Sequence, residues 1–131
     1  MPAWLLNLLC VAGGGASGSL LRWWTALGVK SLLGNAWPWG TLTVNILGCF
    51  LFGFGFQWSL ARGVPDDHPL RLLFFTGFLG AYTTYSTFAF DSHELQLSRG
   101  WHWAMVNVLA QVLLGWLAVW GGIAAAGAYK N

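Results

Sequence analysis

Charged side chains are scarce in this chain: of its 131 residues, 8% are charged and 56% are hydrophobic. A soluble domain carries roughly a quarter charged residues, so the polar side chains here are too few to cover a globule. The six Lys and Arg residues are scattered over expected loops and helix ends and form no basic patch. The composition therefore excludes an ordinary soluble domain, and we expect no nucleic-acid partner.

The charged residues are also missing from four long stretches of the chain. These uncharged runs are Met1–Leu21, Ser31–Ala61, Leu72–Phe90 and Gly100–Tyr129. Each is close to or above the roughly 20 apolar residues that a helix needs to cross a bilayer. We predict an all-α membrane protein, a single multi-pass domain over residues 1–131 with four transmembrane helices at about 4–27, 38–60, 70–90 and 101–126.

A cleaved signal peptide is the alternative interpretation of the first run. No positive residue precedes Trp4, however, and the run continues through a glycine-rich stretch to Arg22. A signal peptide has a positive start and a short apolar core. We therefore expect the first run to be a membrane span.

Catalytic and metal-binding groups are lacking within the predicted spans. The spans contain no Asp, Glu, Lys or Cys/His pair, and no glycine-rich phosphate loop is present. The two cysteines, Cys10 and Cys49, read as small apolar packing residues. We expect no catalytic residues and no enzyme.

The basic residues are balanced between the two sides of the membrane. Four spans place Arg22, Lys30 and Arg99 on one side, and the other side holds Arg62, Arg71 and Lys130. Positive residues normally gather on the cytoplasmic side. The balance fits either a chain that a partner orients or a chain that inserts in both orientations.

Hydroxyl groups are present where hydrocarbon should disfavour them, in the run TTYSTF at residues 83–88. Glycine and β-branched threonine both weaken a helix, so Gly77, Gly80 and Thr83–Thr87 predict a third helix that is broken in mid-membrane. Broken backbone at that depth must be buried in protein or line a cavity. A break frees carbonyls that can hold a cation, and N–H groups that can face an anion.

Two pairs of neutral polar residues with helical spacing accompany this run. Thr41 and Asn45 are four apart in the second span, and Asn107 and Gln111 are four apart in the fourth. One interpretation is hydrogen bonding between helices, helped by small residues that let the helices approach. The other is that they line a path together with the five hydroxyls, since four short helices have little interior to fill.

The groups that would line such a path present positive hydrogen atoms. They are amide and hydroxyl groups, and the rings of Tyr85 and Phe88, whose edges carry partial positive charge. Among these candidate groups the only fixed charge is that of Arg22, near the end of the first span. Such a lining favours a small anion, although the chemistry alone does not name it.

Three sequence blocks resemble the Fluc/CrcB fluoride channels of prokaryotes, and the resemblance covers nearly the whole chain. GGGASGSLLRWW (13–24) is similar to the glycine-rich first helix of that family, which ends in arginine. WGTLTVNILGCFLFG (39–53) resembles the second-helix signature, and TGFLGAYTTYSTFAF (76–90) resembles the broken third helix. The fourth span carries only a weak pattern.

The resemblance implies an antiparallel, dual-topology homodimer in the prokaryotic plasma (inner) membrane. It further implies passive fluoride export through two pores and a structural sodium ion at the dimer interface. It also favours the second explanation of the balanced loop charges.

The resemblance also assigns residues by position. Asn45 would donate to fluoride, and Tyr85 and Phe88 would stand at the pore-facing phenylalanine positions. Thr41, Ser86 and Thr87 would lie along that path, and the carbonyls of Gly80 and Thr83 would hold the sodium. Asn107 and Gln111 are predicted as fourth-helix pore lining from their spacing alone. The chain departs from the family pattern at Tyr85, where phenylalanine is usual, and at Ala81, where glycine is frequent.

Two other functions fit parts of the sequence. A dual-topology small multidrug exporter would need an ionisable carboxylate within the membrane, but the four acidic residues fall outside the spans or at their edges. A non-transporting membrane assembly subunit would use the polar stripes only for packing. Fluoride efflux from liposomes that contain only this protein would separate the three.

Overall fold

The computed structural model describes residues 1–128, which form helices joined by short loops, with no strand in that range. Lys130, one of the six basic residues counted above, lies outside it. The helical elements are α1 (Ala3–Leu33), α2 (Trp39–Ala61), α3 (Pro69–Arg71), the π-helical η1 (Leu72–Leu79), α4 (Gly80–Tyr82), α5 (Tyr85–Arg99) and α6 (Trp101–Ala128). The all-α prediction is confirmed.

Proline marks the start of three helices, and glycine marks the end of two. Each of α1, α2 and α3 has a proline at or directly before its first residue, where the missing N–H group costs least. Gly34 (φ 75°) and Gly100 (φ 98°) follow α1 and α5, and their N–H groups donate to Lys30 O (2.9 Å) and Gln96 O (3.0 Å). A positive φ favours glycine, so these two residues end their helices.

Three of the described helices, α1, α2 and α6, are long and apolar enough to cross a membrane. The remaining segment, from α3 to α5, is interrupted, and each of its pieces is shorter. Two helices extend past the predicted spans by more than a turn: α1 continues to Leu33 and α5 to Arg99. Extended backbone at Thr83 and Thr84 separates α4 from α5, within the run of hydroxyls.

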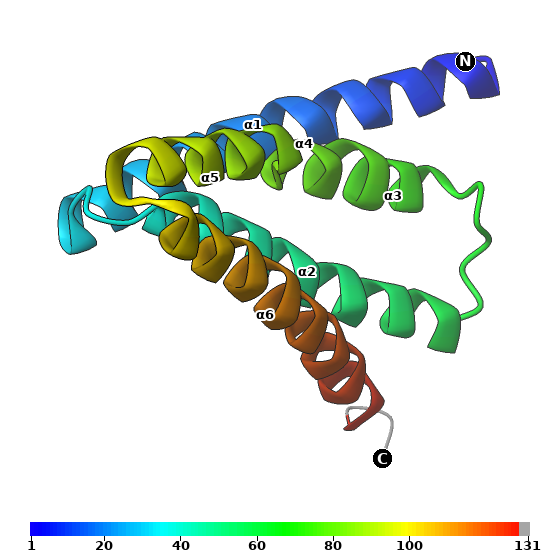
Figure 1. Cartoon of the computed structure of the whole chain (residues 1–131). Coiled ribbons are helices and arrows are strands. Elements are labelled where there is room, and N and C mark those ends of the chain that lie inside the picture. Colours follow the sequence, from blue (N-terminus) through cyan, green and yellow to red (C-terminus); the bar gives the residue numbers. More distant parts are fainter. Residues whose placement is uncertain (129–131) are drawn as a thin grey trace.

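The helices pack as two pairs (Figure 1). One pair is α1 with η1, and the other is α2 with α6, while α5 crosses onto α6. Glycine permits both close contacts: a Cβ atom on Gly18 would collide with the carbonyl oxygen of Phe78, and one on Gly53 with that of Val119. Small residues let membrane helices approach in this way.

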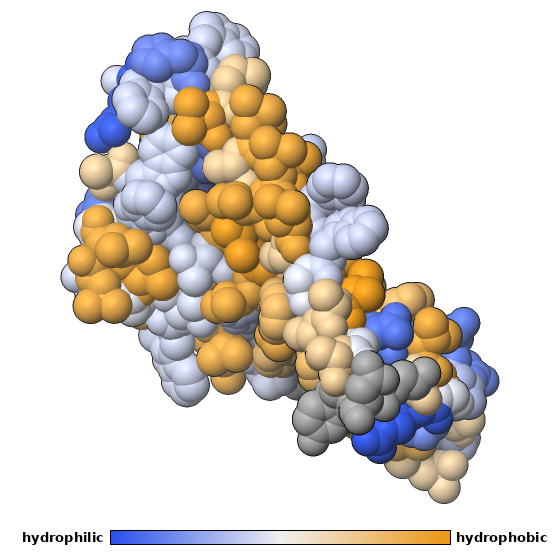
Figure 2. Space-filling model, turned by 90° about the horizontal axis from the view of Figure 1, so that it is seen from below, coloured by the Kyte–Doolittle hydropathy of each residue, from blue (hydrophilic) through white to orange (hydrophobic). Residues whose placement is uncertain are grey.

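Apolar side chains cover much of the outer surface. Figure 2 shows a broad hydrophobic area in the middle of one face, with hydrophilic residues gathered toward the ends. Large apolar residues of α6 such as Trp116, Leu117 and Trp120 are exposed in the single chain. Such a surface suits lipid or a second protein chain rather than water.

Candidate functional site

The break in the third segment redirects the N–H groups of two threonines, Thr84 and Thr87. In a continuous α-helix, Thr84 N–H would donate to Gly80 O, and Thr87 N–H to Thr83 O. Here Thr84 N–H donates to Asn45 Oδ1 (2.8 Å), and Thr87 N–H donates to Thr84 Oγ1 (3.2 Å). The carbonyls of Gly80 and Thr83 therefore lose their helical donors, while Thr84 caps the start of α5.

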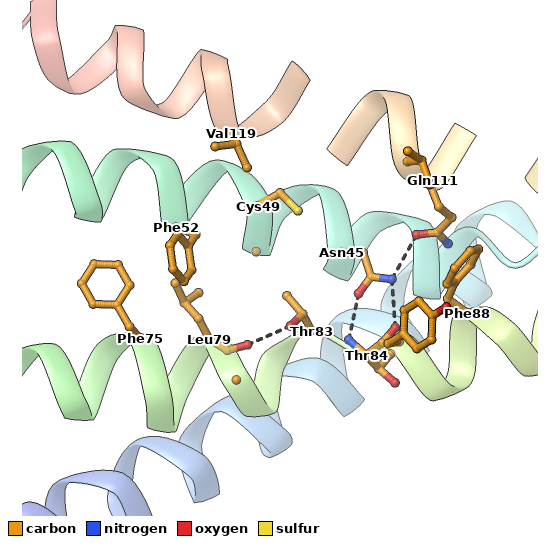
Figure 3. A pocket seen from close by; sticks show the side chains of 14 residues that line it. Asn45, Cys49, Phe52, Phe75, Leu79, Thr83, Thr84, Phe88, Gln111 and Val119 are labelled. Carbon is orange, nitrogen blue, oxygen red and sulfur yellow. Dashed lines mark hydrogen bonds between the residues drawn. The ribbon is translucent and has the colours of Figure 1, made fainter. Parts of the chain in front are cut away.

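Asn45 of α2 holds the break from the side. Its Nδ2 donates to Thr84 O (3.1 Å) and also to Gln111 Oε1 on α6 (3.0 Å). Figure 3 shows this amide between the broken segment and α6. One side chain thus connects three elements that lie far apart in the sequence.

A cavity of about 410 Å³ lies beside this connection (Figure 3). The break, α2, η1 and α6 supply its wall, in which apolar side chains dominate and no Asp, Glu, Lys or Arg takes part. Its lining residues are Asn45, Gly48, Cys49, Phe52, Phe75, Leu79, Gly80, Thr83, Thr84, Tyr85, Phe88, Gln111, Val112 and Val119. The structure therefore brings five predicted site residues to one cavity together with Gln111: Asn45, Gly80, Thr83, Tyr85 and Phe88.

Two aromatic rings of the cavity lining lie next to each other. The centroids of Tyr85 and Phe88 are 5.5 Å apart, and the planes meet at 68°, an edge-to-face arrangement. Tyr85 is 81% exposed in the single chain. Since Tyr85 is exposed and the cavity wall is mostly apolar, this side is suited to contact with another chain.

Thr41 occupies a different environment from Asn45, although both lie on one face of α2. Its hydroxyl donates to Asp91 Oδ2 at 2.5 Å. It lines a second cavity of about 640 Å³, whose charged lining residues are Lys30, Asp91, Glu94 and Arg99. Thr41 therefore lies at a polar cavity near the helix ends, one turn away from the break.

The remaining predicted residues lie outside the first cavity. Asn107 is fully buried and donates to Ser92 Oγ (2.9 Å) between α6 and α5. Ser86 and Thr87 are exposed on α5, and their hydroxyls lie 3.4 and 3.0 Å from Thr84 Oγ1. Arg22 is half-buried on α1 and lines neither cavity. Asn107 and Gln111 were predicted on one face of α6, but Asn107 contacts Ser92 of α5 whereas Gln111 contacts Asn45 at the first cavity.

Sequence reasoning missed two residues that organise the site. Thr84 caps α5 and presents both its backbone groups to Asn45. Threonine is a favoured N-cap residue, but the run of hydroxyls concealed this signal. Asp91 accepts from Thr41, and only the folded chain brings these two together.

Carbonyl oxygens are the ligands that the site offers to a metal ion. Within residues 1–128 no group of three or more His, Cys, Asp or Glu side chains is placed to hold one. The carbonyls of Gly80 and Thr83, deprived of their helical donors, suit a hard cation that prefers oxygen. Gly80 is exposed in the single chain, so ligands from elsewhere can reach it.

Comparison with known proteins gives one consistent result. Residues 9–123 match the family described as CrcB-like protein, Camphor Resistance (CrcB). A protein named "Fluoride-specific ion channel FluC" from Rhizobium leguminosarum bv. trifolii is 44% identical over 121 residues, which cover 92% of this chain and 95% of the relative. Proteins of the same name from Geobacter sulfurreducens (41% over 122 residues, 93% and 98%) and Dehalococcoides mccartyi (41% over 116 residues, 88% and 88%) are also similar.

Proposed function

Because the chain belongs to the CrcB-like protein family, we propose that it is a fluoride-specific ion channel of a bacterial plasma membrane. It is a multi-pass membrane protein and no enzyme. It conducts fluoride passively out of the cytoplasm. The observation that carries the proposal is the cavity at the helix break, where N–H donors and ring edges meet without any carboxylate.

Fluoride is small and strongly hydrated, so it enters a protein only where donors replace its lost water. Asn45, Gln111, Tyr85 and Phe88 line the proposed path at the break. The ring edges of Tyr85 and Phe88 present positive hydrogen in an apolar wall. Such a weak contact lets the anion move on without trapping it. Chloride is larger and accepts hydrogen bonds less strongly, so the same path disfavours it.

The hydroxyl groups extend the path beyond the cavity. Thr41 lies one turn from Asn45 on α2, at the polar cavity near the helix ends, which we assign as the water-facing mouth. Ser86 and Thr87 continue the hydroxyls of Thr84 along α5. Asn107 is assigned to the contact between α5 and α6 instead, because its amide binds Ser92 outside either cavity.

The working unit is an antiparallel homodimer. Tyr85, Ser86 and Thr87 are exposed in the single chain, and hydroxyls facing hydrocarbon at the depth of the break would be costly. A second copy of the chain covers them. The balanced basic residues support copies of opposite orientation, since neither side of the membrane is preferred.

A structural sodium ion belongs at the interface of this dimer. Gly80 and Thr83 supply backbone carbonyls whose helical donors bind elsewhere, and equivalent carbonyls of the second copy complete the set. When bound, sodium supplies positive charge that holds the two broken segments together. If fluoride flux followed an imposed sodium gradient, the sodium ion would be coupled to transport and not structural. The protein would then be a symporter and not a channel.

The direct test uses the purified protein in liposomes loaded with potassium fluoride. A channel releases fluoride down its gradient when a potassium ionophore balances the charge, and a fluoride electrode records the release. Liposomes loaded with chloride, and liposomes without protein, are the controls. A multidrug exporter would instead need a proton gradient and a drug, and an assembly subunit would release nothing.

A further inference from the structure

Tyr82 is a buried tyrosine that lies directly before the break and lines neither cavity. It ends α4, and the extended residues Thr83 and Thr84 follow it. Its side chain is 2% exposed, and a buried tyrosine hydroxyl needs a hydrogen-bond partner. That partner is Thr25 of α1, whose Oγ1 accepts from the Tyr82 hydroxyl at 3.4 Å. This hydrogen bond joins the end of α4 to α1.

Side-chain packing holds the Tyr82 ring on two sides. The ring lies nearly parallel to that of Phe78, with centroids 5.8 Å apart and planes at 5°. It also reaches Gly48 of α2, where a Cβ atom would lie 3.6 Å from Tyr82 Cδ1 and would collide with the methyl group of Thr83. Gly48 therefore leaves room for Tyr82 and Thr83 together, and α4 contacts both α1 and α2.

The break is thus fastened on both sides of Thr83. Tyr82 is hydrogen-bonded to α1, and Thr84 is hydrogen-bonded to Asn45 of α2 by both of its backbone groups. Thr83 turns its own donors back to the preceding turn, because its N–H and its hydroxyl both donate to Leu79 O (3.1 and 3.0 Å). A carbonyl between two fastened residues has little freedom to rotate, so the direction of the Thr83 carbonyl depends on both connections.

We propose that Tyr82, through its hydrogen bond to Thr25, is a positioning residue for the sodium site at the break. The proposal rests on the structural sodium ion of the proposed function and deepens it. Tyr82 supplies no ligand atom, but it keeps the carbonyls of Gly80 and Thr83 in the direction that a cation requires. Ligands that are already oriented bind more tightly because binding does not have to order them, and residues behind the ligands of a metal orient them in this way.

The test measures the unfolding temperature of the purified protein in detergent while sodium chloride replaces choline chloride at constant ionic strength. Tyr82→Phe removes the hydroxyl and keeps the stacked ring, and Thr25→Val removes the accepting oxygen at nearly constant volume. We expect each variant to need about tenfold more sodium than the wild type for half of the maximal rise in unfolding temperature. The double variant should need no more than a single one, because both changes remove the same hydrogen bond.

Two control variants separate positioning from packing. Thr25→Ser keeps a hydroxyl and should keep the sodium midpoint of the wild type. Thr43→Val is the same exchange at a half-buried threonine of α2 that lines neither cavity, and it should leave the midpoint unchanged. If Tyr82 served only for packing, Tyr82→Phe would lower the unfolding temperature equally at every sodium concentration, and this result would overturn the proposal.

A spectroscopic measurement reports on the carbonyl itself. In protein with ¹³C-labelled threonine carbonyls, sodium should shift the Thr83 resonance of the wild type, and in Tyr82→Phe the same shift should appear only at higher sodium. A wild-type response that Tyr82→Phe leaves unchanged overturns the positioning role alone. A wild type that does not respond to sodium at all defeats the proposed sodium site as well, which is a different result.

Discussion

Asn45 binds Thr84 with both ends of its amide, so a change of one atom tests the connection at the break. In Asn45→Asp, an oxygen replaces Nδ2 and faces Thr84 O and Gln111 Oε1, with no hydrogen between them. A buried unpaired charge is strongly unfavourable. We expect fluoride flux from liposomes to fall below detection.

The assembly of that variant decides what the loss means. Size-exclusion chromatography should still find the oligomer of the wild type, because the hydrogen bonds of Asn45 join α2 to Thr84 and Gln111 within one chain. Flux like that of the wild type would remove Asn45 from the site altogether.

Substitutions at Tyr85 and Phe88 distinguish the role of the aromatic ring edge from the role of the hydroxyl group. The two rings meet edge to face at 5.5 Å, and Tyr85→Phe keeps that contact. We expect Tyr85→Phe to retain fluoride conduction within about threefold, a change below 1 kcal/mol. Phe88→Ile removes an aromatic edge and should lower flux by about tenfold or more, if an edge contact is worth ~1.4 kcal/mol.

The same liposome assay measures both variants, and chromatography confirms their assembly. Loss of transport in an assembled Tyr85→Phe protein would make the hydroxyl an essential ligand. The edge contact would then be the wrong description of this position.

At the scale of elements, the break shows how much of the backbone conformation the local sequence can predict. Glycine and threonine propensities place a weak helix over residues 77–87, and extended backbone is found there at Thr83 and Thr84. Gly80 itself is helical (φ −60°, ψ −32°). Propensity indicates where a helix is weak, whereas the contact with Asn45 selects the residues that leave it.

Other features of the elements have no local signal. The π-helical segment Leu72–Leu79 packs against α1, and nothing in its apolar sequence distinguishes it from an α-helix. The spacing of Asn107 and Gln111 predicts a shared face of α6. It cannot predict that α5 supplies a partner to the first and the cavity adjoins the second.

The contact between α1 and η1 can be tested with one methyl group. Gly18→Ala sets a Cβ atom against the carbonyl oxygen of Phe78, whereas Gly28→Ala, on the same helix, meets nothing within 4 Å. Overpacking costs about 1–3 kcal/mol, and backbone gives way less easily than a side chain. We expect Gly18→Ala to unfold at a lower temperature in detergent.

Gly28→Ala is the matched control and should unfold at or above the temperature of the wild type, because alanine favours a helix over glycine. Equal unfolding temperatures for the two variants would contradict the close approach of α1 and η1.

For the whole molecule, the prediction about the orientation of the chain in the membrane depends on where the charged residues lie. Lys30 and Arg99 line the same cavity at one end of the helices, and Arg71 pairs with Asp66 (3.0 Å) in the segment between α2 and η1. The sequence predicted the helices and their balance of charge. It could not predict which residues contact a second chain, except through the family resemblance.

A reporter fused to the C-terminus should therefore be found on both sides of the membrane. Adding two or three lysines at one terminus should shift the population toward one orientation and lower fluoride flux, because fewer chains find an opposite partner. A single orientation of the unmodified chain would contradict the antiparallel dimer.

The two hydrogen bonds between Asn45 and Thr84 also have a consequence for the insertion of the chain into the membrane during synthesis. The N–H and C=O groups of Thr84 have no place in hydrocarbon until an amide meets them, and that amide comes from a helix synthesised earlier. α2 precedes the broken segment along the chain, so its asparagine already waits in the bilayer when residues 83–84 leave the ribosome. The order of synthesis thus supplies the hydrogen-bonding partner before Thr84 needs it. A circular permutation that starts the chain after α2, and so places α1 and α2 behind α6, would reverse that order.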